Sequence, residues 1–159
     1  IINTMITCEN GETISLTLDT TLPRSYSREF TVRGTKGMYE ENTNSVFLDG
    51  EEESFDTIGF YKKTIDNAKN YEEKYLPDMW KNITKEQLEN GHGGMDYFLF
   101  RAFIDAVRNH EPMPIDVYDA AAWMCITPLS EYSIKNENAS VEIPDFTRGK
   151  WKERERLNV

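Results

Sequence analysis

Two apolar stretches that alternate residue by residue flank an Asn-Gly pair near the start of the chain. Residues 4–8 alternate before Asn10-Gly11, and residues 14–18 alternate after it. Asn-Gly is the preferred centre of a tight hairpin turn, and side chains of a strand point to opposite faces with period two. The pattern therefore predicts an antiparallel hairpin with one apolar face, which limits the fold to those built on antiparallel strands.

Helical patterns follow the strand patterns along the chain. Further strand patterns cover residues 30–32, 45–48 and 140–144, and helical patterns cover residues 66–76, 96–110 and 117–135. Residues 82–95 are typical of a polar loop. Strands first and helices later, without β-α-β alternation, predict an α+β fold, a mainly antiparallel open sheet with helices packed on one face.

The first long helical pattern has an apolar face. The helix over residues 96–110 has an apolar stripe of Tyr97, Phe100, Phe103, Ile104 and Val107, which we expect to anchor the core.

The next helix is predicted to start after Asp116, a favoured capping residue, with Asp119 at the third position. Pro128 is predicted to kink this helix, because proline lacks the backbone N–H and crowds the preceding turn.

Composition excludes several classes of function. The chain of 159 residues has a formal net charge of −10, which disfavours nucleic acid and anionic membrane surfaces as partners. It has no stretch of about 20 apolar residues that would span a membrane. Two cysteines, Cys8 and Cys125, and two histidines, His92 and His110, show no zinc-type spacing, so no metal site is predicted.

A glycine-rich stretch, "NGHGGMDY", directly precedes the helical pattern at residue 96. Its letters nearly spell the dinucleotide-binding motif, but Asp96 stands where the last glycine is required. The residues before it are polar and cannot form the buried strand that such a loop follows. The stretch is therefore not predicted to bind a nucleotide.

Two interpretations of His92 remain open from the residues alone. The flanking glycines would let the backbone approach a ligand closely, and the helix start would present unpaired N–H groups. The positive end of the helix would favour a neutral imidazole, which can accept or donate a proton. Alternatively, the stretch is a flexible surface loop with an idle histidine.

Three stretches together resemble a known family. "FTVRGTKGMYEE", "GHGGMDYFLFRAFIDAVRNHEPMPIDVYDAAAW" and "ITPLSEYSI…VEIPDFTRGKW" are similar to the C-terminal domain of the glucose-fructose oxidoreductase and inositol dehydrogenase superfamily. Within it, the chain most resembles the NAD-dependent α-N-acetylgalactosaminidases of glycoside hydrolase family 109. The resemblance runs from about Met5 to Trp151.

The resemblance implies site residues. That family has a G-G-H-G-G loop at its active site, so His92 is the implied catalytic or substrate-contacting residue. The implied substrate-binding loop comprises Asn90, Gly91, Gly93, Gly94 and Asp96. Asn90 stands where the family has its first glycine, and asparagine also tolerates left-handed backbone.

The resemblance also implies the chemistry. NAD would oxidise the C3 hydroxyl of the sugar, a base would remove the C2 proton, the glycosidic bond would be eliminated, and water and hydride would then add back. This is not the paired-carboxylate mechanism of most glycosidases. NAD is expected in the full-length protein, bound by an N-terminal Rossmann domain of its own, and no cofactor is expected in this chain.

The domain organisation follows. We expect residues 1–151 to be the C-terminal substrate and oligomerisation domain of an enzyme, and residues 152–159 to be a charged tail. The start at Ile1 leads us to expect a part of a longer polypeptide. Because the resemblance places the cofactor domain outside this chain, we expect the chain to be inactive alone. We expect the substrate to be a carbohydrate. The open face of the sheet is a candidate contact surface between copies of the chain. The sequence does not decide between the cytoplasm and the periplasm.

Two alternative functions remain. The domain could belong to an ordinary NAD(P)-dependent sugar dehydrogenase that releases NADH. It could also be a non-catalytic binding or assembly module.

Overall fold

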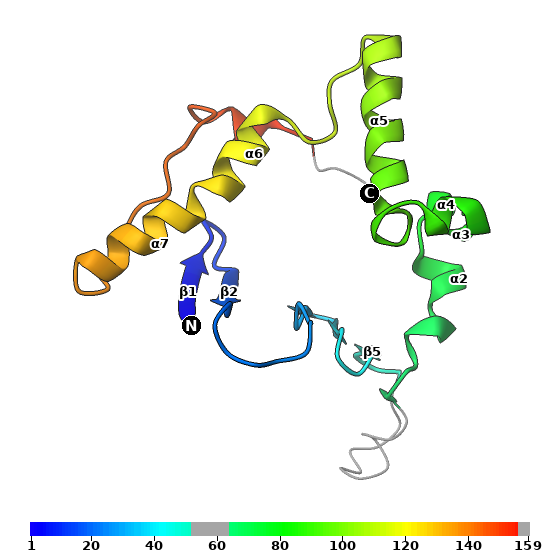
Figure 1. Ribbon diagram of the computed structural model, residues 1–159, viewed down its shortest axis with the longest axis horizontal. Helices are drawn as coiled ribbons and strands as arrows, with labels where there is room; N and C mark the ends of the chain where they lie inside the picture. Colours follow the sequence, from blue (N-terminus) through cyan, green and yellow to red (C-terminus); the bar gives the residue numbers. More distant parts are fainter. Residues whose placement is uncertain (52–63, 156–159) are drawn as a thin grey trace. The chain divides into compact units, whose positions relative to one another are not determined.

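The computed structural model describes residues 1–51 and 64–155, which fall into two compact units. The first unit contains Ile1–Thr20 and Thr84–Val159, and the second contains Thr21–Ile83. The strands are β1 (Ile2–Thr7), β2 (Thr13–Leu18), β3 (Thr31–Gly34), β4 (Gly37–Glu40) and β5 (Ser45–Leu48) (Figure 1). The α-helices and short 3-10 helices (η) are η1 (Ala68–Asn70), α2 (Glu72–Tyr75), α3 (Asp78–Lys81), α4 (Lys85–Glu89), η2 (His92–Gly94), α5 (Met95–Asn109), α6 (Val117–Met124), α7 (Ile126–Lys135) and η3 (Lys150–Glu153). The predicted α+β class is confirmed.

The first unit begins with the predicted hairpin. β1 and β2 pair antiparallel, with Ile6 opposite Ile14. The Cys8 N–H donates to the Glu12 carbonyl over 2.8 Å, and Gly11 at the turn has a φ of +94°. The hairpin predicted at Asn10-Gly11 is therefore confirmed.

A hydroxyl pair joins this hairpin to α7. The Thr4 and Ser130 hydroxyl oxygens lie 2.8 Å apart, and the Ser130 hydroxyl also donates to the Ile126 carbonyl over 2.7 Å. A serine hydroxyl has one proton, so Thr4 is the donor to Ser130. This contact places β1 beside a helix that lies 126 residues away along the sequence.

The long helical pattern after Asp116 is broken, as Pro128 predicts. α6 ends at Met124 and α7 begins at Ile126, with Cys125 between them. The proline ring crowds the carbonyl four residues earlier, which belongs to Met124. The break therefore falls one turn before the proline.

The second unit is built on a three-stranded antiparallel sheet in the order β3-β4-β5. β3 and β4 form a tight hairpin in which Gly34 pairs with Gly37, and β4 pairs with β5 so that Met38 lies opposite Phe47. The strands predicted around residues 30–32 and 45–48 are confirmed. The strands of the described residues thus form two sheets rather than one.

Asn67 covers the outer edge of β5. Its side-chain oxygen accepts from the Val46 N–H over 2.7 Å, and its amide nitrogen donates to the Val46 carbonyl over 2.8 Å. The residue is only 8% exposed. An unpaired edge strand offers its N–H and C=O groups to other chains, and this amide occupies one such pair.

Three predictions about local structure differ from the observed elements. Residues 66–76 form two short helices, η1 and α2, rather than one. Residues 82–95, predicted as a loop, contain α4 and η2. Residues 140–144, predicted as a strand, adopt no regular structure, since they pair with none of the described strands to complete a ladder.

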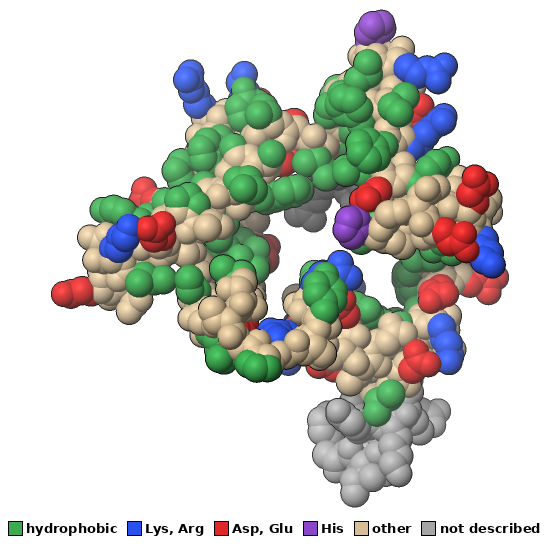
Figure 2. Space-filling view, in the orientation of Figure 1, with side chains coloured by type: hydrophobic (Ala, Val, Ile, Leu, Met, Phe, Trp, Pro, Cys, Tyr) green, Lys and Arg blue, Asp and Glu red, His purple; other side chains and the backbone are tan. Residues whose placement is uncertain are grey.

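The apolar stripe of α5 does not anchor a core among the described residues. Phe100, Phe103, Ile104 and Val107 are each 47% to 62% exposed, and Ala106 is the buried apolar residue of the described part of the chain. Figure 2 shows hydrophobic side chains at the surface along this helix. The predicted helix is confirmed, but its predicted burial in this chain is wrong. No helix among the described residues is long and apolar enough to cross a membrane.

Replacing Asn67 is expected to destabilise the second unit. The Asn67→Ala variant leaves the N–H and C=O of Val46 without their partner in a half-buried position. We expect a loss of about 1–3 kcal/mol in the free energy of unfolding, measured by chemical denaturation. Asn70→Ala, at an exposed position of η1, is the control and should change it by less than about 0.5 kcal/mol. Equal losses in the two variants would contradict the role of Asn67.

Candidate functional site

The residues predicted as the substrate loop lie together at the start of α5. α4 is closed at its N-terminus by a reciprocal capping box between Thr84 and Gln87, and it ends before Asn90. The Gly94 N–H then donates to the carbonyls of Asn90 and Gly91, over 3.0 and 3.1 Å. These bonds close a tight turn that joins α4 to α5.

This turn has four consecutive residues in the left-handed region of backbone conformation. Their φ values are +28° at Gly91, +50° at His92, +68° at Gly93 and +91° at Gly94. Glycine adopts such angles without steric cost, and this explains why three glycines are clustered here. Histidine is sterically strained in this conformation, and strain of this kind concentrates at functional sites.

The substitution of asparagine for the first loop glycine has little structural consequence. Asn90 has a φ of −78°, in the extended region open to every residue. Its side-chain amide donates to the Glu86 carbonyl over 3.1 Å, closing the last turn of α4. The left-handed run begins only at the next residue, so position 90 does not require glycine.

His92 is paired with Asp96, one helical turn further along. The His92 Nδ1 atom lies 3.0 Å from both carboxylate oxygens of Asp96. The His92 side chain is 74% exposed, and no hydrogen bond to its Nε2 atom is recorded among the described residues. The imidazole therefore has one nitrogen engaged and one available to a ligand.

Sequence reasoning missed two features of this site, and each had a signal. The spacing of four residues between His92 and Asp96 only hinted at a pair, because residues 92–94 have positive φ values and do not form a regular helical turn. The Thr84-x-x-Gln87 pattern is a capping box, which predicts a helix start within the stretch interpreted as a loop.

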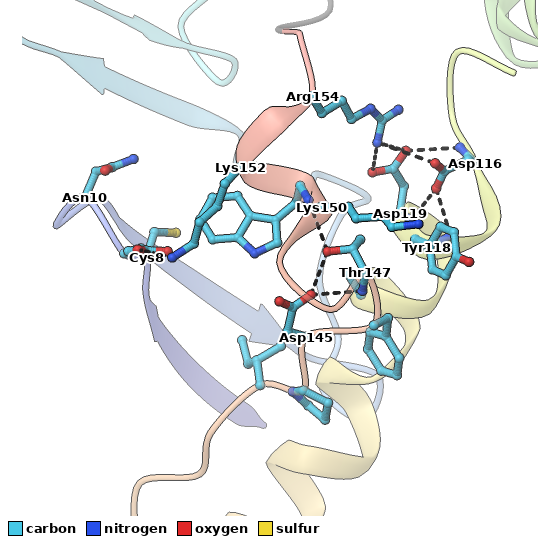
Figure 3. Close-up of a pocket in the computed structure, with 16 residues that line it drawn as sticks. Cys8, Asn10, Asp116, Tyr118, Asp119, Asp145, Thr147, Lys150, Lys152 and Arg154 are labelled. Atoms are coloured by element: carbon cyan, nitrogen blue, oxygen red, sulfur yellow. Dashed lines mark hydrogen bonds and ion pairs between the residues drawn. The ribbon is translucent and has the colours of Figure 1, made fainter. Parts of the chain in front are cut away.

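A separate, open pocket of about 830 Å³ lies in the first unit and includes none of the loop residues (Figure 3). It is lined by the hairpin turn, the start of α6 and the segment from Ile143 to Arg154. Among the described residues, no group of three or more His, Cys, Asp or Glu side chains is arranged to hold a metal ion.

Arg154 anchors this C-terminal segment to the N-terminus of α6. Its Nη1 atom donates to both carboxylate oxygens of Asp119, over 2.7 and 2.8 Å, and its Nη2 atom donates to the Pro114 carbonyl over 3.1 Å. Asp119 also accepts from the Asp116 N–H, and Asp116 caps the helix, as predicted for both residues. Together these bonds hold the pKa of the Asp119 carboxyl below its usual range, with the Arg154 hydrogen bond as the largest cause and the Asp116 N–H next.

Near the opposite side of the pocket, Lys152 pairs with Glu9 of the hairpin turn over 3.0 Å. Lys152 and Arg154, from the segment predicted as a charged tail, thus contact the first unit. The remainder of that segment, residues 156–159, lies outside the described residues.

The Asp119 ion pair is expected to make stability depend on pH. Because the folded-state pKa is lowered, the stabilisation is present above the ordinary aspartate pKa, about 3.9, and is lost as the pH falls through the folded-state value. Asp119→Asn should lower the melting temperature by about 2–4 °C at pH 7, since the pair is partly exposed, and the difference should shrink on acidification. Thermal scans from pH 7 to pH 2 test this, with Glu142→Gln, an exposed site, as the control. A gap that stays constant with pH would contradict the assignment.

Comparison with known proteins identifies the family of the chain. Residues 1–153 match the family model described as glycosyl hydrolase 109, C-terminal domain. A glycosyl hydrolase family 109 protein of Stenotrophomonas maltophilia is 44% identical over 154 residues, which cover 97% of this chain and 32% of that protein.

Two relatives are named for an activity. An alpha-N-acetylgalactosaminidase of Tannerella forsythia is 42% identical over 95% of this chain and 31% of its own length. An alpha-N-acetylgalactosaminidase of Shewanella oneidensis is 38% identical over 98% of this chain and 33% of its own length. The chain therefore spans about a third of these curated relatives. On the family match over residues 1–153 and these identities, the chain belongs to glycosyl hydrolase family 109 and corresponds to its C-terminal domain.

Proposed function

We propose that the protein containing this chain hydrolyses α-N-acetylgalactosaminides with the help of NAD, and that His92 contacts the sugar and transfers a proton. The observation that carries this proposal is the geometry of His92, with Nδ1 bound to Asp96 and Nε2 available in a loop of glycines. Two relatives whose names give this activity support the choice of substrate.

The loop suits contact with a sugar. Residues 91–94 place little side-chain bulk beside the imidazole, so hydroxyl groups of a ligand can come close to the backbone. An imidazole whose free nitrogen faces solvent can take a proton from a substrate carbon or oxygen, or return one. The residues of this chain therefore supply a proton-transfer group and a surface that a sugar can approach.

The described residues do not fit NAD. Both sheets are antiparallel, and the glycine-rich turn follows the short helix α4 rather than a buried parallel strand. Dinucleotide sites use a glycine-rich turn between a parallel strand and a helix. In our proposal NAD is held by a part of the protein outside this chain.

The role of His92 is tested by mutation in the full-length protein. His92→Ala should lower the turnover of a chromogenic α-N-acetylgalactosaminide on the order of 100-fold, the usual scale for loss of a proton-transfer group. The melting temperature should hardly move, because the side chain is 74% exposed. The control is His110→Asn, at the other histidine, where φ is +57° and asparagine tolerates the same backbone.

Two results would count against this role. Near-normal hydrolysis by His92→Ala would show that His92 does not take part in the reaction. Accumulation of NADH with substrate, without release of the sugar, would favour an ordinary dehydrogenase instead.

The placement of NAD outside this chain is tested by titration calorimetry. NAD should give no measurable heat of binding with the isolated chain, after circular dichroism has shown that the chain is folded, and should bind the full-length protein. Micromolar binding to the isolated chain would show that our assignment of the cofactor site is wrong.

A further inference from the structure

Asp96 determines which nitrogen of His92 is available. Both of its carboxylate oxygens lie 3.0 Å from His92 Nδ1. An ionised carboxylate only accepts hydrogen bonds, so a neutral imidazole in this position carries its proton on Nδ1. The lone pair of the ring is then on Nε2.

Gly91 provides the space for this carboxylate. A Cβ atom built at Gly91 would lie 2.1 Å from Asp96 Oδ2 and 2.8 Å from its Cγ, well inside van der Waals contact. A Cβ atom at Gly93 would meet no atom within 4 Å, although its backbone is also left-handed. The two glycines thus have different roles, since Gly93 serves the backbone and Gly91 also leaves room for the Asp96 side chain.

We propose that Asp96 is a positioning residue that holds His92 in its Nδ1–H form and fixes the direction of Nε2, and that glycine is needed at position 91 so that the Asp96 carboxylate can fold back onto the ring. This rests on the proposed function only in that His92 is the group that acts. The pair itself can be measured without substrate.

The first measurement is the tautomer of His92 in the full-length protein. Nitrogen-15 NMR of protein labelled at histidine identifies His92 by the signal missing from His92→Ala. We expect the Nδ1–H form in the unmodified protein. Asp96→Asn can donate its amide proton to Nδ1 and should shift the population to the Nε2–H form.

Gly91→Ala tests the same contact between His92 and Asp96 without changing either residue. It should displace the carboxylate and also reduce the Nδ1–H population, while leaving the negative charge at the start of α5. It therefore serves as the test if Asp96→Asn fails to fold. Gly93→Ala is the matched control, because it places a methyl group on a left-handed residue without meeting Asp96, and it should keep the Nδ1–H form.

The second measurement is turnover. Asp96→Asn should lower kcat by at least about 10-fold, since loss of a carboxylate that orients a histidine costs about 10- to 100-fold at metal sites and more in a catalytic triad, with KM changed by less than about threefold. Gly91→Ala should have a similar effect. In an Asp96→Ala background, adding Gly91→Ala should change kcat by less than about threefold, because the group it displaces is already gone.

Three outcomes would overturn the proposal. The first is a tautomer unchanged in both Asp96→Asn and Gly91→Ala. The second is a full, multiplicative effect of Gly91→Ala in the Asp96→Ala background, which would assign its effect to backbone strain. The third is a normal kcat in Asp96→Asn while His92→Ala is inactive, which would show that Asp96 does not position His92 although His92 itself acts in the reaction. Normal hydrolysis by His92→Ala would instead overturn the proposed function.

Discussion

The left-handed run at residues 91–94 is the constraint on which the candidate site depends. It turns the chain between α4 and α5 within four residues, and the bonds from the Gly94 N–H close the turn. Within this turn, the Nδ1 atom of His92 lies 3.0 Å from the carboxylate oxygens of Asp96. A loop of ordinary residues would have to open the turn, because side chains with a Cβ atom are strained at these angles.

Polar contacts between distant segments connect the remainder of the first unit. Thr4 bonds to Ser130, Glu9 pairs with Lys152, and Asp119 pairs with Arg154. Exposed ion pairs of this kind contribute little each, so they fix register more than they supply stability. Burial of the apolar stripe of α5 would contribute more free energy, and among the described residues its side chains are only partly covered. Because the stripe and the His92 loop share one helix, burial of the stripe would also fix the direction of the loop.

Local features were predicted well from the sequence, and features that depend on distant segments were not. The Asn10-Gly11 hairpin, the Asp116 cap and the break before Pro128 follow from backbone geometry within a few residues, and all are present. The prediction of a strand at residues 140–144 was wrong, because an alternating pattern does not show whether another strand is available for pairing. The α5 stripe shows the same limit, since periodicity identifies an apolar face but not what covers it.

The candidate site was predicted only in part. The glycine pattern and the family resemblance pointed to the loop that contains His92, but the role of Asp96 as its partner was missed. That pairing depends on the left-handed angle of His92 and on the space at Gly91, and neither is visible in the letters alone. The roles proposed for these residues are predictions for the experiments above.

The ionisation of the described carboxyl groups bears on the choice between a histidine and a pair of acids. A glycosidase of the usual kind needs one carboxyl with a raised pKa, so that it remains protonated and can act as an acid. In the described part of the chain, the carboxyl groups whose pKa departs from its ordinary value are Glu41, Asp66, Asp119, Glu131 and Asp145. In each of them hydrogen bonds from neighbouring donors lower the pKa, which is the wrong direction for a general acid. These groups serve as helix caps, turn anchors and ion-pair partners.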